Sequence, residues 1–201
     1  MTKEEIKDWI IHEFKNGYIR HTWFPMLTTR GMRDYSETVH STGLNYITEM
    51  GRQLDGYTAL SEYPVYPVHE KFSHSLTREV RPDSIWYDKD SLKPVLVSEF
   101  ERFENSKAKN DKLREKIENL LIAYHQLGGD IPIILFVYWS YNGIIPRDIE
   151  KYISIFDEGF RLPNGTYING INSFISDYLV FQAVAQGGKE RLTINQWIQV
   201  K

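Results

Sequence analysis

Apolar residues recur at helical spacing in three places within the first two thirds of the chain. Near the N-terminus, an apolar stripe follows Thr2, which forms a capping-box sequence with Glu5, and Gly17 is placed to end this helix. A second helix is predicted over about 41–54. A third and longer helix is predicted over 104–127, because a regular apolar stripe there runs up to a pair of glycines.

The pattern changes to that of strands between the second and third helices. Segments 57–66, 80–87 and 94–100 are rich in aromatic and β-branched residues, and polar or proline-containing connections separate them. They are predicted to form a meander. The almost wholly apolar segment 131–140 follows the long helix, which favours a strand buried on both faces and reached by a parallel crossover.

The C-terminal third is expected to be helical. Segment 146–158 begins with a proline, which suits the first turn of a helix, and its apolar residues follow helical spacing. A final helix is predicted near 173–186, ending at Gly187 and Gly188.

These elements predict one α/β domain over 1–201, with a mixed central sheet flanked by helices. No internal repeat or linker-like stretch marks a boundary. The core, over about 41–140, has the order α-β-β-β-α-β, and helical additions are expected over 1–40 and 141–201.

The composition bears on the size of the core, on chemistries that need cysteine and on the expected location of the protein. The 201 residues are 41% hydrophobic, which is enough for a substantial core. The sequence has no cysteine, which excludes a disulfide framework, a thiolate zinc site and a cysteine nucleophile, and makes a cytoplasmic location the expectation. No segment approaches the roughly 20 apolar residues of a membrane span, so no membrane association is expected.

Charge and motifs exclude several classes of function. The formal net charge of -3 argues against a generic polyanion binder but leaves room for an enzyme that acts on nucleic acid through a local basic face. The sequence contains no HExxH, Walker A, GxGxxG or GxSxG motif. Zinc peptidase, nucleotide hydrolase, dinucleotide oxidoreductase and serine hydrolase chemistries therefore have no support.

Three carboxylates in segment 81–102 are the main candidate site. Asp83 lies on one predicted strand, and Glu99 and Glu101 lie two apart on the next, so these two share a face. Clustered carboxylates repel one another unless a cation neutralises them, and Mg²⁺ prefers oxygen ligands. The alternative is that all three are solvated strand-end residues, paired with Arg81 and Arg102.

The same residues resemble a known family. Pro82-Asp83 and Glu99-Phe100-Glu101, in this order of elements, resemble the core of the PD-(D/E)xK nuclease superfamily, over roughly 41–140. Glu101 stands where the motif usually has lysine, as in the ExE variant known among type II restriction endonucleases. The resemblance implies a restriction-endonuclease-like fold and Mg²⁺-dependent (or Mn²⁺-dependent) hydrolysis of DNA. Restriction-type cutting would favour a homodimer.

The resemblance also implies roles for individual residues. Asp83 and Glu99 would bind the metal, helped by the backbone carbonyl of Phe100, and the metal would polarise the phosphate and activate water. Glu101 would complete the metal shell or accept the proton of the water. Glu62, on the strand before Asp83, corresponds to a further acidic ligand in related ExE enzymes, although an ordinary exposed strand position is an equal alternative.

The missing lysine has a candidate substitute in the long helix. Lys109 falls within the apolar stripe, one turn before Leu113, and there it could reach the site and stabilise charge on the phosphate. A lysine snorkelling at the edge of the core is the alternative.

Basic residues near the site are candidate DNA contacts, and Arg81 is one of them. The others are Arg102, Lys107 and Lys112, which belong with Arg114 and Lys116 to a basic concentration over 102–116. Acidic residues alternate with them, so a solvated helix face held by ion pairs is the alternative.

The sequence therefore predicts a Mg²⁺-dependent deoxyribonuclease, with one rival. The rival is a non-catalytic nucleic-acid-binding or assembly protein that keeps the nuclease fold but has lost turnover through the altered lysine position. Metal dependence separates the two.

Overall fold

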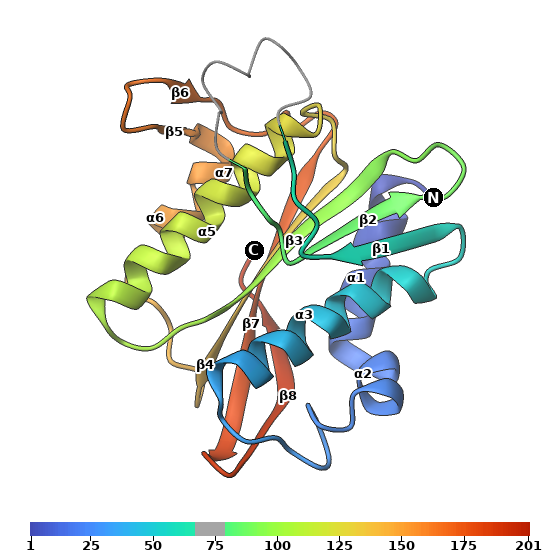
Figure 1. Cartoon of the computed structure of the whole chain (residues 1–201), viewed down its shortest axis with the longest axis vertical. Helices are drawn as coiled ribbons and strands as arrows, with labels where there is room; N and C mark the ends of the chain where they lie inside the picture. The colour runs from blue at the N-terminus through green and yellow to red at the C-terminus, as the bar shows by residue number, and fades with distance from the viewer. Residues whose placement is uncertain (67–78) are drawn as a thin grey trace.

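The computed structural model describes residues 1–66 and 79–201, and its centre is a strongly twisted, six-stranded mixed sheet (Figure 1). The strand order is β1-β2-β3-β4-β7-β8. These strands are β1 Tyr57–Ser61, β2 Ser84–Asp88, β3 Pro94–Arg102, β4 Ile133–Tyr141, β7 Asp177–Gly188 and β8 Arg191–Gln199. A separate small hairpin consists of β5 Phe160–Arg161 and β6 Tyr167–Ile168.

Helices cover both faces of the sheet, so the predicted α/β class is confirmed. The described helices are α1 Lys3–Asn16, α2 Tyr18–Trp23, α3 Ser36–Gln53, α5 Lys107–Gln126, α6 Ile149–Ile153 and α7 Ile155–Glu158. Among the described residues, none of the helices combines the length and apolar character needed to cross a membrane.

The strand pairing follows the predicted order. β1, β2 and β3 pair antiparallel as a meander, and α5 then connects β3 to β4, which pairs with it in parallel. β7 continues the sheet in parallel to β4, and β8 returns antiparallel. The parallel crossover that the apolar segment 131–140 predicted is confirmed.

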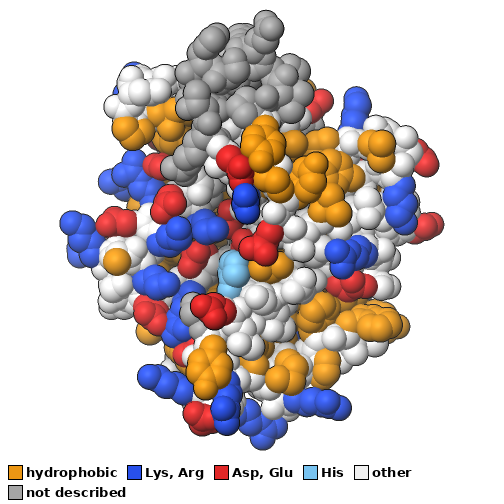
Figure 2. Space-filling model, in the orientation of Figure 1, with side chains coloured by type: hydrophobic (Ala, Val, Ile, Leu, Met, Phe, Trp, Pro, Cys, Tyr) orange, Lys and Arg blue, Asp and Glu red, His pale blue; other side chains and the backbone are white. Residues whose placement is uncertain are grey.

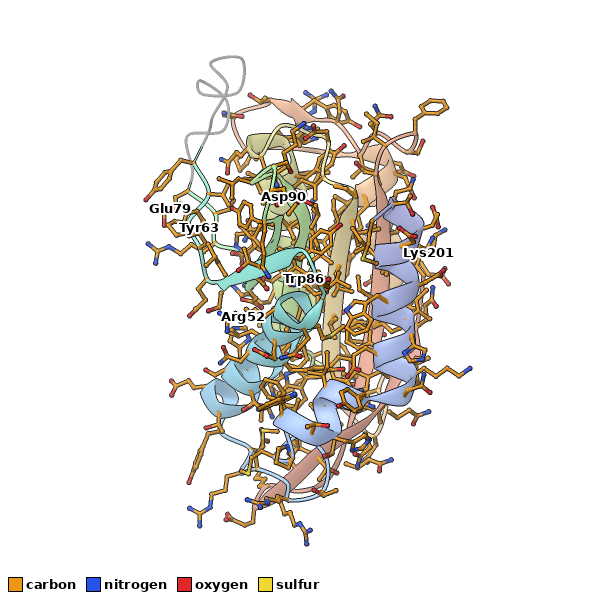
Figure 3. The ribbon with its side chains drawn as sticks, turned by 90° about the vertical axis from the view of Figure 1, so that its right-hand side faces the viewer. Arg52, Tyr63, Glu79, Trp86, Asp90 and Lys201 are labelled. Atoms are coloured by element: carbon orange, nitrogen blue, oxygen red, sulfur yellow. The ribbon has the colours of Figure 1, made fainter. Side chains whose placement is uncertain are left out.

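Alternation along β3 divides its side chains between two cores. Leu96 and Phe100 belong to the core that α1 and α3 cover, and Figure 3 shows these two helices in front of the strands. Val97 belongs to the other core, beneath α5. Because residues two apart share a face, Glu99 and Glu101 point to the same side, as predicted, and this is the α5 side.

α3 lies unusually close to the sheet because it presents glycines to it. A Cβ atom on Gly43 would lie 2.1 Å from the Phe100 ring, and one on Gly51 would lie 2.6 Å from the Trp86 ring. Any larger residue would force the helix away from β2 and β3. The glycines therefore set the depth at which α3 side chains reach the ends of these strands.

The predicted final helix over 173–186 is wrong, and the helical addition over 141–201 is only partly correct. The helix predicted over 146–158 is present as α6 and α7, but β7 and β8 occupy 177–199. The run from Tyr178 to Ala185 is buried throughout, because its two faces lie against the two cores. A short apolar run of this kind fits a buried helix or a doubly covered strand equally well.

Two predicted strands are shorter than expected. The strand predicted over 57–66 ends at Ser61, because the next residue, Glu62, has a left-handed backbone with φ 49°. The strand predicted over 80–87 begins at Ser84, and an isolated bridge pairs Val65 with Val80. Most of the predicted polar connection between them lies outside the described residues.

Candidate active site

The three carboxylates of the candidate site are buried at one end of β2 and β3. Asp83 immediately precedes β2 and is 3% exposed, while Glu99 and Glu101 in β3 are 1% and 8% exposed. Arg81 pairs instead with Glu79, and Arg102 with Asp34 and Glu104. The alternative of solvated carboxylates paired with these two arginines is therefore wrong.

The pairing of β2 with β3 brings Asp83 beside Glu99. Ser84 pairs with Ser98 in this antiparallel register. Asp83, the residue before Ser84, therefore faces Glu99, the residue after Ser98. The Phe100 backbone N–H donates a hydrogen bond of 2.7 Å to Asp83 Oδ2. One oxygen of the Asp83 carboxylate is thus fixed by the backbone of β3.

The electrostatics of the two carboxylates differ. Burial raises the pKa of Glu99 well above its ordinary value, and the negative charge of Asp83 raises it further. Burial also acts to raise the pKa of Asp83, but the hydrogen bond from His40 and the charge of Lys116 hold it below its ordinary value. The pair therefore carries one firmly ionised carboxylate and one whose ionisation depends on a nearby positive charge.

Lys116 of α5 supplies that positive charge. Its Nζ atom lies 2.6 Å from Glu99 Oε2, and the side chains of Lys116 and Glu99 are 16% and 2% exposed. Burial by itself lowers the pKa of Lys116, but the charges of Glu99 and Asp83 outweigh burial and raise it. Lys116 is therefore a protonated ammonium group inside the site.

The sequence analysis predicted Lys109 as the substitute for the missing lysine of the motif and placed Lys116 only in the basic concentration. Lys109 Nζ lies 4.0 Å from Glu101 Oε1, at the edge of the site, while Lys116 lies two helical turns further on. Lys116 falls three residues after Leu113 and four before Leu120, both fully buried. That spacing placed it on the apolar stripe and could have identified it.

His40 of α3 is a second residue that sequence reasoning missed. Its Nδ1 lies 2.8 Å from the Phe100 carbonyl oxygen, and its Nε2 lies 3.4 Å from Asp83 Oδ1. The hydrogen bond to Asp83 raises the pKa of His40. The predicted second helix began at about residue 41, so His40 fell outside the pattern, whereas α3 begins at Ser36.

Two other predicted ligands have different surroundings. Glu62 is exposed and follows β1, and its backbone N–H donates to the carbonyl oxygen of Asp83 at 3.1 Å. Its backbone touches the site, but its side chain is not buried with the other carboxylates. The Phe100 carbonyl lies within the site, where His40 already contacts it.

The predicted DNA contacts fall into two groups. Arg102 is held by a fork on Asp34, with distances of 2.8 and 3.1 Å, and lies 4.8 Å from the centre of the Trp139 ring. The others are more exposed: Arg81 pairs with Glu79, Lys107 begins α5, and Lys112 Nζ lies 3.3 Å from a Glu115 oxygen.

An open cleft of about 270 Å³ lies beside the carboxylates, and Glu101 is the one of the three that lines it. Its lining combines acidic and basic side chains, from Glu37, His40, Glu101, Arg102, Lys112 and Lys116. Figure 2 shows carboxylates beside a histidine near the middle of this face, with Lys and Arg side chains over α5 to their left. Asp83 and Glu99 do not line the cleft themselves, but His40 and Lys116, which do, contact them.

The donor set fits a hard divalent cation. Asp83 and Glu99 provide carboxylate oxygens from adjacent strands, and their mutual repulsion favours a cation between them. Across residues 1–66 and 79–201, no three His, Asp or Glu side chains stand together in a ready-made metal-binding arrangement. In the structure, Lys116 and His40 provide the positive charge and the hydrogen bonds that the carboxylates require.

Comparison with known proteins gives no family: no family model matches the chain, and no curated protein matches it. The functional argument therefore depends on the residues of the site and on the arrangement of the elements that carry them.

Proposed function

We propose that this protein is a metal-dependent deoxyribonuclease with a restriction-endonuclease-like fold and an ExE variant of the PD-(D/E)xK site. The observation that carries this proposal is the buried pair Asp83 and Glu99, with the Lys116 ammonium 2.6 Å from Glu99 and itself lining an open cleft. The order of the described elements α3, β1, β2, β3, α5 and β4 supports it, because it matches the order that the resemblance implies.

The residues of the site divide the chemistry between them. Asp83 and Glu99 would hold the cation, which would supply Lewis-acid polarisation of the phosphodiester and a lowered pKa for the attacking water. Lys116 then stabilises the negative charge that develops on the phosphate, which is the role usually given to the lysine of the motif. Glu101 borders the cleft and accepts the proton of the water, with Lys109 beside it.

The basic side chains of the cleft bind the substrate. Lys112 and the exposed Lys107 on α5 contact backbone phosphates, while Arg102 borders the cleft from β3. Arg102 is already held by Asp34 and Glu104, so it provides a fixed guanidinium group rather than a mobile one. The cleavage product expected from the resemblance carries a 5′-phosphate.

A non-catalytic nucleic-acid-binding protein is the second candidate, and one observation favours it. Lys116 and His40 already provide positive partners for Glu99 and Asp83, so the site has a satisfied arrangement without a metal ion. In such a protein, the cleft would bind DNA but the bound DNA would stay intact.

The two candidates are separated by an assay with plasmid and single-stranded DNA in the presence of Mg²⁺ or Mn²⁺. The nuclease proposal predicts cleavage by the wild type and a loss of about 10²-fold or more in Asp83→Ala and Lys116→Met. Lys151→Met is the control, because Lys151 is exposed on α6 and does not line the cleft. If the wild type cuts neither substrate and calorimetry detects no divalent-ion binding, the nuclease proposal fails.

A further inference from the structure

A second cavity lies at the carboxyl ends of three parallel strands. β3, β4 and β7 run in parallel, and their last residues line it, namely Arg102, Tyr141 and the pair Gly187 and Gly188. Figure 1 shows the arrowheads of β4 and β7 together at the lower end of the sheet. In open α/β sheets, ligands bind in the crevice outside the carboxyl ends of the strands. The cavity therefore lies where such a sheet binds ligands.

The cavity has the size of a single nucleotide. Its volume is about 520 Å³, and pockets that hold one small ligand measure about 300–1,000 Å³. A duplex is too wide for such a space, because its major groove alone is about 12 Å across. Arg102 also lines the cleft beside the carboxylates, so the two cavities adjoin. A DNA strand with its phosphates along that cleft would place a neighbouring nucleotide here.

Hydrogen bonds fix the lining of the cavity around the buried carboxylate of Asp34. Asp34 accepts the fork from Arg102, at 2.8 and 3.1 Å, and its Oδ2 also accepts the hydroxyl hydrogen bond of Tyr141 at 2.8 Å. The Asp34 backbone N–H donates to the Lys189 carbonyl oxygen at 2.7 Å. Four lining residues from separate segments are thus positioned before a ligand binds, which lowers the entropic cost of binding.

The lining offers groups that bind the parts of a nucleotide. Tyr141 presents an aromatic ring held in place by its hydroxyl contact, and bases that are not paired stack on such rings. Lys189 is exposed, and the carboxylate of the neighbouring Glu190 pairs with Arg33. The Lys189 ammonium is therefore placed to meet a phosphate.

Gly188 leaves space in the cavity that the fold does not require. A Cβ atom on Gly188 would have no atom of residues 1–66 or 79–201 within 4 Å of it. Gly187 differs, because it has φ 94° and a Cβ there would lie 2.2 Å from the Arg191 carbonyl oxygen. A side chain at position 188 would therefore take up room beside the lining without straining the hairpin of β7 and β8.

We propose that this cavity binds an unpaired nucleotide next to the phosphate that the site cleaves, with its base stacked on Tyr141 and a phosphate on Lys189. The substrate class is then DNA with an unpaired nucleotide at the site, either a single strand or a duplex from which one nucleotide is turned out. This inference rests on the proposed function, because the cleft beside the carboxylates sets the course of the strand.

Binding of a short fluorescent single strand, measured by anisotropy with all divalent ions chelated, tests the cavity without cleavage. The wild type is expected to bind the single strand more tightly than the fully paired duplex of the same sequence. Gly188→Leu and Tyr141→Leu should each weaken single-strand binding about 10-fold or more and duplex binding less than about 2-fold. Gln186→Leu is the matched control, because Gln186 is exposed on β7 but does not line the cavity, and it should bind as the wild type does.

Two further measurements separate stacking from a structural effect. Tyr141→Phe keeps the ring but loses the hydrogen bond to Asp34, so it should bind the single strand within about 3-fold of the wild type. In ¹⁵N-labelled wild type, the single strand should shift the backbone amide signals of Gly188 and Lys189. The shifts decide the question even if a leucine variant does not fold, which circular dichroism would reveal.

The outcomes distinguish this inference from the proposed function. If the wild type binds the single strand through the cavity but cuts no DNA with Mg²⁺ or Mn²⁺, the inference stands and the nuclease proposal fails. If the wild type cuts DNA but folded Gly188→Leu and Tyr141→Leu bind the single strand as the wild type does, the cavity assignment is overturned. Equal weakening of single-strand and duplex binding, or unshifted amides of Gly188 and Lys189, would also overturn it.

Discussion

At the scale of single residues, the buried pair of Lys116 and Glu99 is the feature on which both stability and chemistry depend. Both side chains are removed from water, so each depends on the other for compensation of its charge. Removing only the ammonium leaves Glu99 buried beside Asp83 without its partner. The cost of such a change is much larger than that of breaking an exposed ion pair.

We therefore expect Lys116→Met to lower the free energy of unfolding by about 3–5 kcal/mol at neutral pH. The double variant Lys116→Met with Glu99→Gln should recover much of this loss, because it removes both charges. Urea unfolding measures the effect.

The matched control is Lys112→Met, because Lys112 pairs with Glu115 on the exposed face of the same helix. This change should cost less than about 1 kcal/mol. Equal losses of unfolding free energy in the two lysine variants would show that the pair of Lys116 and Glu99 contributes no more to stability than an exposed ion pair.

The sequence predicted part of this site, and geometry explains which part. The burial of Glu99 and Glu101 on one face follows from the period of a single strand, and the proximity of Asp83 follows from the pairing of neighbouring strands. His40 and Lys116 come from two helices on opposite faces of the sheet. Their convergence depends on how those helices pack, which no local pattern specifies.

At the scale of elements, the close approach of α3 to β3 places His40 against the strand. Gly43 lies one turn after His40, and its missing side chain leaves the space that the Phe100 ring fills. Because Phe100 is fully buried, its ring has little freedom to move away. The position of His40 is therefore coupled to the packing beneath it.

Gly43→Ala should destabilise the protein although alanine is the better helix former. The added Cβ would lie 2.1 Å from the Phe100 ring, and overpacking of this kind costs about 1–3 kcal/mol, against a gain in helix propensity of about 1 kcal/mol. Thermal unfolding measures the balance. Asn45→Ala, at an exposed position of α3, is the control and should be neutral or slightly stabilising. A Gly43→Ala protein with a raised midpoint would contradict this account of the helix contact.

The errors of element prediction also have a physical cause. β7 was predicted as a helix because its apolar run carries no clear alternation, and both of its faces turned out to be buried. The long helix was predicted correctly because α5 has one buried face and one solvated face. Periodicity therefore identifies elements at the surface better than those at the centre of the sheet.

At the scale of the whole molecule, the last strand, β8, packs against the first helix, α1. Trp197 of β8 stacks on Phe14 of α1 with ring centres 4.5 Å apart, and its ring centre lies 5.4 Å from that of Tyr46 in α3. This aromatic cluster joins segments from both ends of the chain into the core that supports Phe100. The core predicted over 41–140 thus depends on residues outside it.

Trp197→Ala is expected to lower the free energy of unfolding by about 3–5 kcal/mol, because it opens a cavity between α1, α3 and β8. Chemical denaturation followed by circular dichroism measures this loss. Ile198→Ala, at the neighbouring and 39% exposed position of the same strand, should cost far less. If the two changes cost the same, β8 is not an integral part of the core.

The central claim is that Asp83 and Glu99 serve a metal-dependent cleavage of DNA, and plasmid nicking by the Glu99→Gln variant tests it most directly. The matched control is Glu115→Gln, which removes a half-exposed carboxylate that pairs with Lys112 on α5. The account predicts that the wild type and Glu115→Gln nick supercoiled plasmid with Mn²⁺ and stop when the metal is chelated. It predicts a loss of about 10²-fold or more for Glu99→Gln. Nicking by Glu99→Gln at the wild-type rate, or persistence of wild-type nicking after chelation, would contradict it.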